Sequence, residues 1–330
     1  MKLRMNRNTG KIVMISAGLC LLGILLFRLL SAWEAGLGVP DAEYPKDDGR
    51  IYMNDGWYVP KKKLDTVLII GVDKYEAQTS DSGYNNTQQA DFLMLLLIDA
   101  EEKAYTALHL NRDTMTDIQK LGVRGEPAGT FTGQLALAHT YGSGGKDSCR
   151  NTVDAVSNFL YGIDIDHYIS LTMDAVAKIN DAVGGVTLTL MEDFTALDPT
   201  MVKGAEVTLN GDMALSYVRA RQGLADSTNL GRMERQRQYL RALKQKLIDA
   251  DAKDDGFFLA TMETVSEYVV SDCTANQLSR LYERIAEYTA GDIVSVAGEA
   301  VQGEAFMEFY ADEEALKKQV VQLFYESAAD

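Results

Sequence analysis

Histidine and cysteine are both scarce in this sequence, which contains three of each among its 330 residues. The histidines are His109, His139 and His167, and no two of them stand at the short spacings that zinc motifs use. This spacing predicts that the chain has no zinc site.

Positive charge is also in short supply. Lysine and arginine number 32 against 48 aspartates and glutamates, so the formal net charge is -16. Residues 1–33 carry five cations and no acid, which leaves -16 - 5 = -21 on the remainder. Such an acidic surface repels the phosphates of nucleic acids. We therefore expect no nucleic acid partner, and a role as a transcriptional regulator is disfavoured.

One long uncharged run lies near the N-terminus, at Ile12–Phe27, and apolar residues continue beyond Arg28 to Trp33. This stretch is long enough to cross a bilayer, and the cations that precede it favour a cytoplasmic N-terminus. We expect a single transmembrane anchor over 12–33 in the cell membrane, a cytoplasmic tail over 1–11, and an extracellular main domain. A cleaved signal peptide is the alternative, although no small-x-small cleavage site directly follows the run.

The cysteines allow a prediction once this topology is assumed. Cys20 lies within the expected span, which leaves Cys149 and Cys273 outside, where disulfides persist. We expect these two residues to form a disulfide bond, and two buried free thiols are the alternative.

Strand and helix patterns alternate through the rest of the chain. Residues 34–63 are expected to form an extracellular spacer with a hairpin, because two short apolar runs flank Asn54-Asp55-Gly56. The main domain is expected over 64–330, where Thr66–Ile70 is an apolar run typical of a buried parallel strand. The pattern predicts an α/β fold in three layers, with helices on both faces of a mixed central sheet. Further strands are expected at Asp91–Ile98, Tyr105–Leu110, Tyr168–Leu171, Val186–Leu190 and Ile293–Ala297, and further helices at Asn151–Leu160, Asp174–Val183, Gly256–Val270, Ala275–Thr289 and Asp312–Tyr325.

Charged residues stand at the ends of the first three strands of this domain. Asp73 and Arg112 come just past strand ends, where ligands of open α/β sheets gather. Asp91 begins the second strand, which brings it near Asp73 only if that strand is antiparallel to the first. Two carboxylates beside arginines are suited to hold Mg²⁺ against a phosphate. The alternative is that both aspartates are ordinary turn and cap residues.

Six arginines crowd into residues 219–241, although the chain as a whole is acidic. Apolar and polar residues alternate over Leu215–Arg221, which predicts a strand with Arg219 and Arg221 on one face. Arginine is suited to bind phosphate because its planar guanidinium donates two parallel hydrogen bonds.

The segment that follows has the apolar spacing of a helix, at positions Leu230, Met233, Leu240, Leu243 and Leu247. That spacing places Arg232 and Gln236 beside the apolar stripe, and Arg237 and Arg241 away from it. An inward guanidinium requires an anionic partner. The segment therefore predicts a receptor for a multiply charged anion, and an amphipathic helix with solvated cations is the alternative.

A glycine-rich stretch over 138–146 is similar to a phosphate loop but lacks the Walker spacing. We expect it to form a turn that opens the helix beginning near Asn151. His139, within the stretch, is expected to be a hydrogen-bonded structural residue rather than a catalytic base.

Taken in order, these residues resemble the LytR–CpsA–Psr family of cell-wall phosphotransferases over about Leu64 to Lys246. The similarity is carried by Gly71-Val72-Asp73, the acid-led strand at Asp91, Asn111-Arg112-Asp113-Thr114, His139-x-Tyr141-Gly142, Ile165-Asp166-x-Tyr168, Val183-Gly184-Gly185-Val186 and the two arginine motifs.

Members of that family move glycopolymers such as teichoic acid or capsule from undecaprenyl pyrophosphate onto peptidoglycan, with Mg²⁺. The resemblance implies that Asp73 and Asp91 ligate the Mg²⁺ ion and that Asp113 supports the catalytic site. It also implies that a polyprenyl tail lies in an apolar tunnel between sheet and helices. The residues that would bind the pyrophosphate are Arg112, Arg219, Arg221, Arg232 and Gln236.

Gln89 departs from the family pattern, which usually has arginine two residues before the acid of the second strand. Glutamine can hydrogen-bond a phosphate but brings no charge, and losing one charge-assisted contact costs about 1.5–3 kcal/mol. The departure leaves two functions open. One is a phosphotransferase that acts on a polyprenyl-pyrophosphate-linked glycopolymer with peptidoglycan as acceptor. The other is a non-catalytic protein that binds or scaffolds the polyprenyl pyrophosphate.

Overall fold

The structure is a computed structural model that describes residues 49–53, 56–73, 78–80, 83–85, 88–122, 124–220, 228–254 and 256–328. The predicted tail and membrane anchor (1–33) and Arg221 lie outside these residues. Within the described part, no helix combines the length and the apolar character needed to cross a membrane. The chain divides into two compact units, and the second begins at Pro60.

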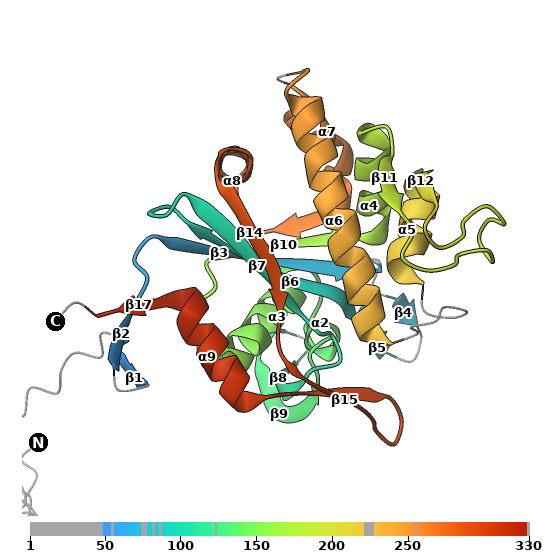
Figure 1. Cartoon of the computed structure of the whole chain (residues 1–330). Coiled ribbons are helices and arrows are strands. Elements are labelled where there is room, and N and C mark those ends of the chain that lie inside the picture. The colour runs from blue at the N-terminus through green and yellow to red at the C-terminus, as the bar shows by residue number, and fades with distance from the viewer. Residues whose placement is uncertain are drawn as a thin grey trace, which may run out of the picture. The chain divides into compact units, whose positions relative to one another are not determined.

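A six-stranded mixed sheet forms the centre of the second unit (Figure 1). Its strand order is β13-β10-β3-β6-β7-β14. β3 pairs parallel with β10 and antiparallel with β6, so the run predicted to be a parallel strand has one neighbour of each kind. The bounds are β3 Leu64–Val72, β6 Ala90–Asp99, β7 Ala104–Leu110, β10 His167–Thr172, β13 Val269–Ser271 and β14 Thr289–Ser295.

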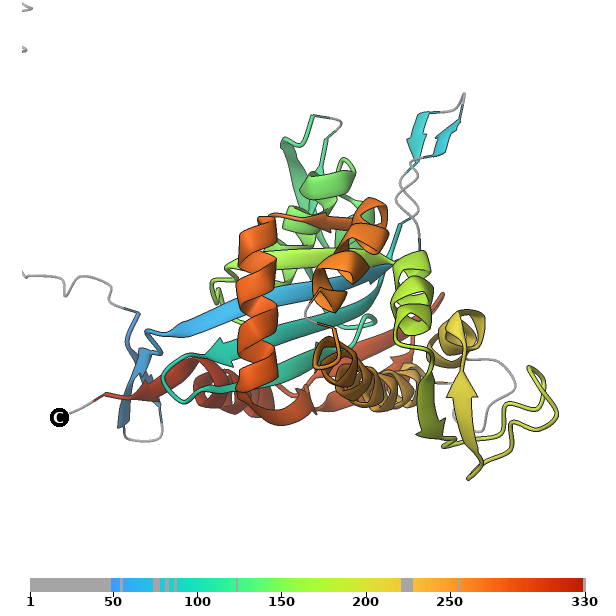
Figure 2. The same cartoon turned by 90° about the horizontal axis from the view of Figure 1, so that it is seen from above.

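Both faces of this sheet are apolar. Successive side chains of β3 point to opposite sides of the sheet, and apolar residues occupy both sets of positions. Leu68 and Ile70 join the core that contains residues of α3 (Gly145–Phe159) and α9 (Glu313–Phe324). Val67 packs on the other face with Leu281 of α8 (Ala275–Glu287). Figure 2 shows α8 lying across the strands on that side. The predicted α/β class with a mixed central sheet and helices on both faces is thus confirmed.

A second core lies beside the sheet, between α4 (Met173–Ala182), the hairpin of β11 (Val186–Thr189) and β12 (Glu206–Leu209), α5 (Gly211–Arg219) and α6 (Asn229–Asp251). The strand predicted over Leu215–Arg221 is wrong, because α5 is a helix through Arg219. Asn210 caps it by accepting a hydrogen bond from the Met213 amide at 2.9 Å. Ala214, Tyr217 and Val218 repeat at helical spacing and are buried, and this longer period outweighs the short alternation.

The remaining elements are shorter. The predicted hairpin near residue 54 is confirmed as β1 and β2, which pair antiparallel. Three other hairpins, β4–β5, β8–β9 and β15–β16, are not among the predicted elements. The bounds are β1 Ile51–Met53, β2 Gly56–Pro60, β4 Gln78–Ser80, β5 Gly83–Asn85, β8 Met115–Leu121, β9 Pro127–Gln134, α2 Leu137–Thr140, α7 Phe257–Val265, the 3-10 helix η1 Ser266–Tyr268, β15 Gly298–Gln302, β16 Met307–Ala311 and β17 Tyr325–Ser327.

The predicted disulfide is also wrong, since Cys149 and Cys273 are both free. Cys149 is buried in the core on the α3 face of the sheet. Cys273 follows β13 and lines a cavity together with Val67 and Leu281, on the α8 face. The sheet therefore separates the two thiols. Burial raises the pKa of the Cys149 thiol to about 11, so this thiol stays protonated at neutral pH.

Candidate active site

The two predicted carboxylates lie at the same end of two neighbouring central strands of the sheet. β3 and β6 are antiparallel, and Val72, the residue before Asp73, pairs with Ala90, the residue before Asp91. Asp91 was expected near Asp73 only if the second strand is antiparallel to the first, and the structure meets this condition. Asp73 is half-exposed, whereas the Asp91 side chain is 19% exposed. Asp73 is therefore open to a ligand from solvent, whereas Asp91 lies largely within the protein.

Arg112 links the residues at this end of the strands. Its guanidinium forms an ion pair with Asp91 and donates a hydrogen bond to Gln89 Oε1 at 2.6 Å. Its Nε also donates to Asp113 Oδ1 at 3.3 Å. Only 12% of the Arg112 side chain is exposed, so these acceptors fix the direction of the guanidinium.

Asp113 is itself held in place by its surroundings. Gln134 Nε2 donates to Asp113 Oδ1 at 2.9 Å, and the Asp113 amide donates to Asn111 Oδ1 at 2.9 Å. The same Asn111 oxygen accepts from Asn229 Nδ2 at 2.6 Å, which ties the start of α6 to the end of β7. The buried Asp113 carboxylate thus faces Arg112 and Gln134, and these contacts favour a role in positioning Arg112.

Helix α6 brings a second guanidinium to Asp91. Arg232 Nη2 donates to the Asp91 carbonyl oxygen at 3.1 Å, and Nη1 lies 3.8 Å from Asp91 Oδ1. Gln236, one turn later, is buried and donates to the Val218 carbonyl oxygen at 3.3 Å. The predicted inward orientation of Arg232 and Gln236 is confirmed. Asp91 therefore lies between two guanidinium groups that come from different elements.

Arg219 ends α5 and pairs with the exposed carboxylate. Its Nη2 lies 3.0 Å from Asp73 Oδ1, and both side chains are about half exposed. The structure thus brings Asp91, Arg112, Asp113, Arg232 and Gln89 into one connected set of contacts. Asp73 and Arg219 form a separate ion pair at the same end of the strands. Gln236 is one helical turn away from Arg232.

Arg237 does not face solvent as predicted. It forms an ion pair with Glu234, and its side chain is only 14% exposed. It also lies close enough to His109 to affect that ring. Burial, together with the charges of Arg237 and Arg232, lowers the pKa of His109 to about 3, so the ring is neutral at physiological pH. Helical spacing alone missed this because other elements pack over the side of α6.

Arg235 was not singled out from the sequence, although it is 1% exposed. Its guanidinium donates to Glu192 Oε1 at 2.8 Å and to the Ala220 carbonyl oxygen. It thereby fixes the chain directly after Arg219. The spacing from Arg232 through Arg235 to Tyr239 was the available signal, since residues three and four apart share a helix face.

His139 has the structural role expected of it. Its Nδ1 donates to the Gln88 carbonyl oxygen at 3.0 Å, and Thr140 Oγ1 donates to the same oxygen at 3.1 Å. Burial lowers the pKa of His139 to about 4. The pair of hydrogen bonds holds the backbone that presents Gln89 to Arg112.

An apolar cavity of about 110 Å³ lies between the sheet and helices α4, α5 and α6. Gln236 and Thr172 are the polar side chains of its lining, and the Tyr239 hydroxyl donates to Asn180 Oδ1 at 3.1 Å. Gly71 and Phe92, which line it, are close in sequence to Asp73 and Asp91. The cavity thus adjoins the charged cluster, by which we mean Asp73, Asp91, Arg112, Arg219 and Arg232. The residues that line the cavity are Ile69, Gly71, Phe92, Leu171, Thr172, Met173, Val176, Val218, Gln236, Tyr239 and Leu240.

Comparison with known proteins agrees with the motifs that this end of the sheet brings together. The model of the LytR–CpsA–Psr family matches residues 46–324. The chain belongs to the LytR–CpsA–Psr family.

Relatives within the family carry names that describe an activity. The polyisoprenyl-teichoic acid–peptidoglycan teichoic acid transferase TagU of Halalkalibacterium halodurans is 31% identical over 225 residues, which are 68% of this chain and 64% of that protein. The chain thus spans slightly less than two thirds of that relative.

Solved structures of the LytR–CpsA–Psr family share the fold. The crystal structure of Bacillus subtilis TagV matches with a TM-score of 0.60 and 26% identity, over 80% of this chain and 96% of that chain. A structure of TagT bound to LI-WTA matches with a TM-score of 0.60 and 19% identity, over 79% of this chain and 90% of that chain.

The residues present fit the Mg²⁺ ion that the LytR–CpsA–Psr resemblance implies. Mg²⁺ is commonly held by one or two carboxylates together with substrate phosphates, because it retains several waters and dehydrates reluctantly. Asp73 and Asp91 supply two such carboxylates at one end of the sheet. Each is paired with an arginine, and these arginines are placed to bind the phosphates that would complete the site.

Proposed function

We propose that this protein transfers a glycopolymer from a polyprenyl-pyrophosphate carrier onto peptidoglycan, outside the membrane to which residues 12–33 anchor it. The single observation that carries the proposal is the apolar cavity beside the cluster of Arg112, Arg219 and Arg232. A ligand that suits both parts has an anionic head joined to an apolar chain. A polyprenyl pyrophosphate has this chemistry.

The reaction is a phosphoryl transfer. A peptidoglycan sugar hydroxyl attacks the phosphorus that bears the glycopolymer, a phosphodiester forms, and polyprenyl monophosphate leaves. Arg112, Arg219 and Arg232 would bind the phosphate oxygens and stabilise the charge that builds on them in the transition state. Mg²⁺ held by Asp73 and Asp91 would supply further neutralisation of that charge. Asp113 keeps Arg112 aimed at the ligand.

The cavity gives a direct test of the carrier. Val176 lines the cavity, and the larger ring of Val176→Phe would fill part of the cavity while leaving the charged cluster in place. We expect affinity for a long polyprenyl donor to fall by about tenfold or more, because each buried methylene contributes about 0.8 kcal/mol. Binding of inorganic pyrophosphate, which has no apolar tail, should be unchanged. The measurement is displacement of a fluorescent polyprenyl pyrophosphate.

The matched control is Val202→Phe, which adds the same ring at a position that is 46% exposed. It should bind both ligands as the wild type does. A Val176→Phe protein that retains full affinity for the long donor would place the tail elsewhere.

A second candidate function is non-catalytic binding of the same lipid, and Gln89 favours it. Gln89 accepts a hydrogen bond from Arg112 and brings no charge of its own. A site that lacked an arginine needed for catalysis would still bind the lipid-linked glycopolymer but would not transfer it. The two functions therefore predict different results for one substitution.

We predict that Gln89→Arg changes the transfer rate by about tenfold or less, equivalent to about 1.4 kcal/mol. The new guanidinium would replace the acceptor that orients Arg112, so the gain in charge is offset by repulsion between two cations. Gln89→Ala should likewise have a modest effect. The measurement is Mg²⁺-dependent transfer by the wild type and both variants. An inactive wild type that Gln89→Arg activates would establish the binding protein instead.

A further inference from the structure

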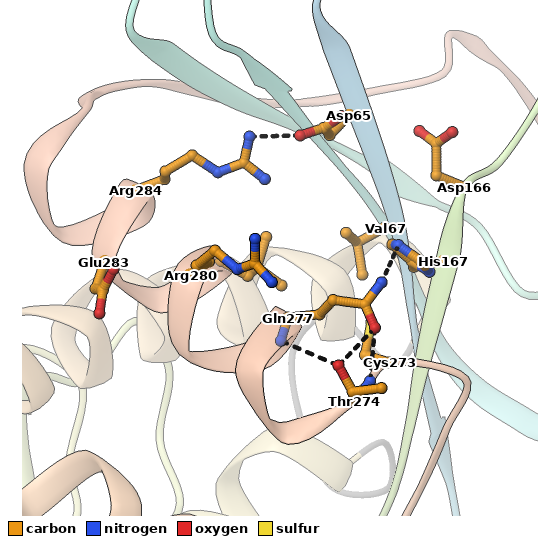
Figure 3. A pocket seen from close by; sticks show the side chains of 11 residues that line it. Asp65, Val67, Asp166, His167, Cys273, Thr274, Gln277, Arg280, Glu283 and Arg284 are labelled. Atoms are coloured by element: carbon orange, nitrogen blue, oxygen red, sulfur yellow. Dashed lines mark hydrogen bonds and ion pairs between the residues drawn. The ribbon is translucent and has the colours of Figure 1, made fainter.

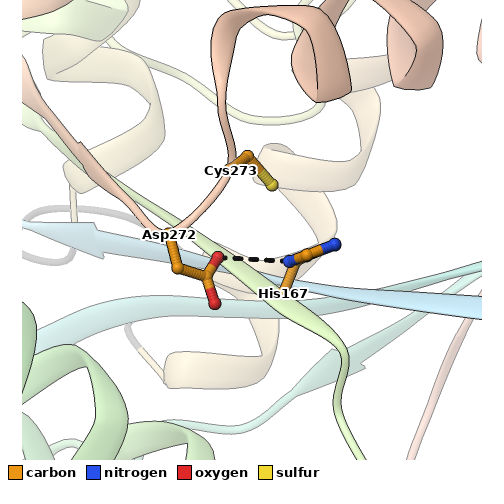
Figure 4. Close-up of side chains that lie close together, drawn as sticks. All are labelled: His167, Asp272 and Cys273. Carbon is orange, nitrogen blue, oxygen red and sulfur yellow. Dashed lines mark ion pairs between the residues drawn. The ribbon is translucent and has the colours of Figure 1, made fainter.

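Three metal-ligand side chains meet at the far end of the sheet from Asp73 and Asp91. His167 begins β10 and pairs in register with Val67, near the start of β3. Asp272 and Cys273 follow β13 and precede α8. Figure 4 shows the three side chains converging, and their ligand atoms all lie within 4.8 Å of one another. Because the residues are far apart in sequence, motif spacing could not reveal them.

The contacts around the three residues fix their backbone but leave one ring nitrogen unused. His167 Nδ1 lies 3.5 Å from Asp272 Oδ1, and among the described residues this buried nitrogen has no hydrogen-bond partner. The Tyr168 amide donates to the same Asp272 oxygen at 3.0 Å, and the Cys273 amide donates to Ser271 Oγ at 3.0 Å. A buried unpartnered polar atom is costly, and a cation between these groups would satisfy Nδ1 in the tautomer that carries its proton on Nε2.

We propose that His167, Asp272 and Cys273 bind a divalent cation of the zinc class. Zinc is borderline-soft and accepts imidazole nitrogen, carboxylate oxygen and thiolate sulfur in one site. Zn–N and Zn–O distances of about 2.0–2.2 Å and a Zn–S distance of about 2.3 Å place tetrahedral ligands roughly 3.3–3.7 Å apart. The 3.5 Å between the nitrogen and the oxygen already meets this. Closure of the cluster by about 1 Å toward the sulfur completes it, and the thiol proton is released to solvent as the cation binds.

The fourth coordination position faces a cavity of about 680 Å³, which His167 and Cys273 line together with Thr274, Gln277 and Arg280 (Figure 3). Asp166 also lines it, but its Oδ2 accepts from the Thr66 amide at 2.8 Å and from Thr66 Oγ1 at 2.9 Å. Three protein ligands with one open position are the arrangement of zinc sites that exchange water or a bound ligand. The cation would therefore be reachable from solvent.

Gln277 faces the other ring nitrogen of His167. Its Nε2 lies 3.2 Å from His167 Nε2, while its Oε1 accepts from the Thr274 amide at 2.8 Å and so caps α8. Coordination through Nδ1 requires a proton on Nε2, which would then face a second donor. A carboxylate at position 277 could accept from both Thr274 and His167. A carboxylate behind a ligating histidine also raises the basicity of that ligand.

The test is a titration of the reduced full-length chain in detergent with Zn²⁺ and with Co²⁺, in excess Mg²⁺ so that the hard carboxylate site does not compete. We expect about one Zn²⁺ per chain at the site. Co²⁺ should give a thiolate-to-metal absorption band. Cys273→Ser should abolish that band, and His167→Gln should weaken Zn²⁺ binding by about tenfold or more. Cys149→Ser, which removes the other thiol outside the predicted span, should bind as the wild type does.

Gln277→Glu provides the opposite expected change, since it should tighten Zn²⁺ binding by roughly tenfold. An increase in affinity cannot be explained by a misfolded variant, and thermal unfolding of each protein checks its fold. The proposal is overturned if the wild type gives no thiolate band with Co²⁺, or if Cys273→Ser retains it. Unchanged or weaker Zn²⁺ binding in Gln277→Glu would contradict the coordination through Nδ1.

Discussion

Asp91→Asn is expected to lower the rate of glycopolymer transfer by about 10²–10³-fold, the range for losing one preorganised electrostatic contact of the transition state. The substitution keeps the shape of the side chain but removes the charge that lies between Arg112 and Arg232. It removes one of the two carboxylates proposed to hold Mg²⁺ as well. The measurement is single-turnover transfer from a polyprenyl-pyrophosphate donor to peptidoglycan fragments at saturating Mg²⁺.

The control for this substitution lies on the same strand. Asp99 lies at the opposite end of β6 from Asp91. Its Oδ1 accepts hydrogen bonds from the Glu101 and Glu102 amides, each at 3.0 Å. Asp99→Asn should leave the transfer rate unchanged. A rate for Asp91→Asn within tenfold of the wild type, or an equal loss in both variants, would mean that Asp91 is only a structural residue.

Arg235→Ala is expected to destabilise the folded protein by about 3–5 kcal/mol, the cost of removing one partner of a buried ion pair. The Glu192 carboxylate, 14% exposed, would lose its cation, and the Ala220 carbonyl oxygen would lose a donor. Because Ala220 follows Arg219, the arginine that faces Asp73 would also lose its fixed position. Urea unfolding measures the loss of stability.

Two further variants make this prediction specific. Arg241→Ala removes an exposed cation from the same helix and should change stability by less than about 0.5 kcal/mol. Replacing the pair together, as Arg235→Met with Glu192→Leu, should recover much of the loss, because no unpaired charge remains buried. A single substitution of Arg235 that costs no more than that of Arg241 would refute the role assigned to the pair.

Much of the candidate site could be predicted from the sequence, because it depends on where strands end. Asp73, Asp91 and Arg112 flank apolar runs that were recognisable as buried strands, and the structure brings them to one end of the sheet. What the sequence left open was the direction of the second strand. Strand direction depends on connections and pairing partners, which local hydrophobicity does not specify.

The errors have physical causes as well. A seven-residue alternation at Leu215–Arg221 predicts a strand, but the Asn210 cap and the buried face of α5 extend over a longer window and specify a helix. The disulfide was predicted from the compartment alone, whereas the sheet separates Cys149 from Cys273. The expectation of no zinc site is a different case and stays a prediction. It considered only spacing along the chain, whereas the fold brings His167 close to Asp272 and Cys273.

The most direct measurement of the central claim is product analysis by mass spectrometry. Purified full-length protein is incubated with Mg²⁺, a glycopolymer linked to polyprenyl pyrophosphate, and peptidoglycan fragments. The proposed transfer predicts that the fragments gain the glycopolymer with one phosphate, and that one polyprenyl monophosphate is released for each transfer. Donor that stays bound and unchanged, with no modified fragment formed, would contradict the proposal and identify the protein as a lipid-binding member of its family.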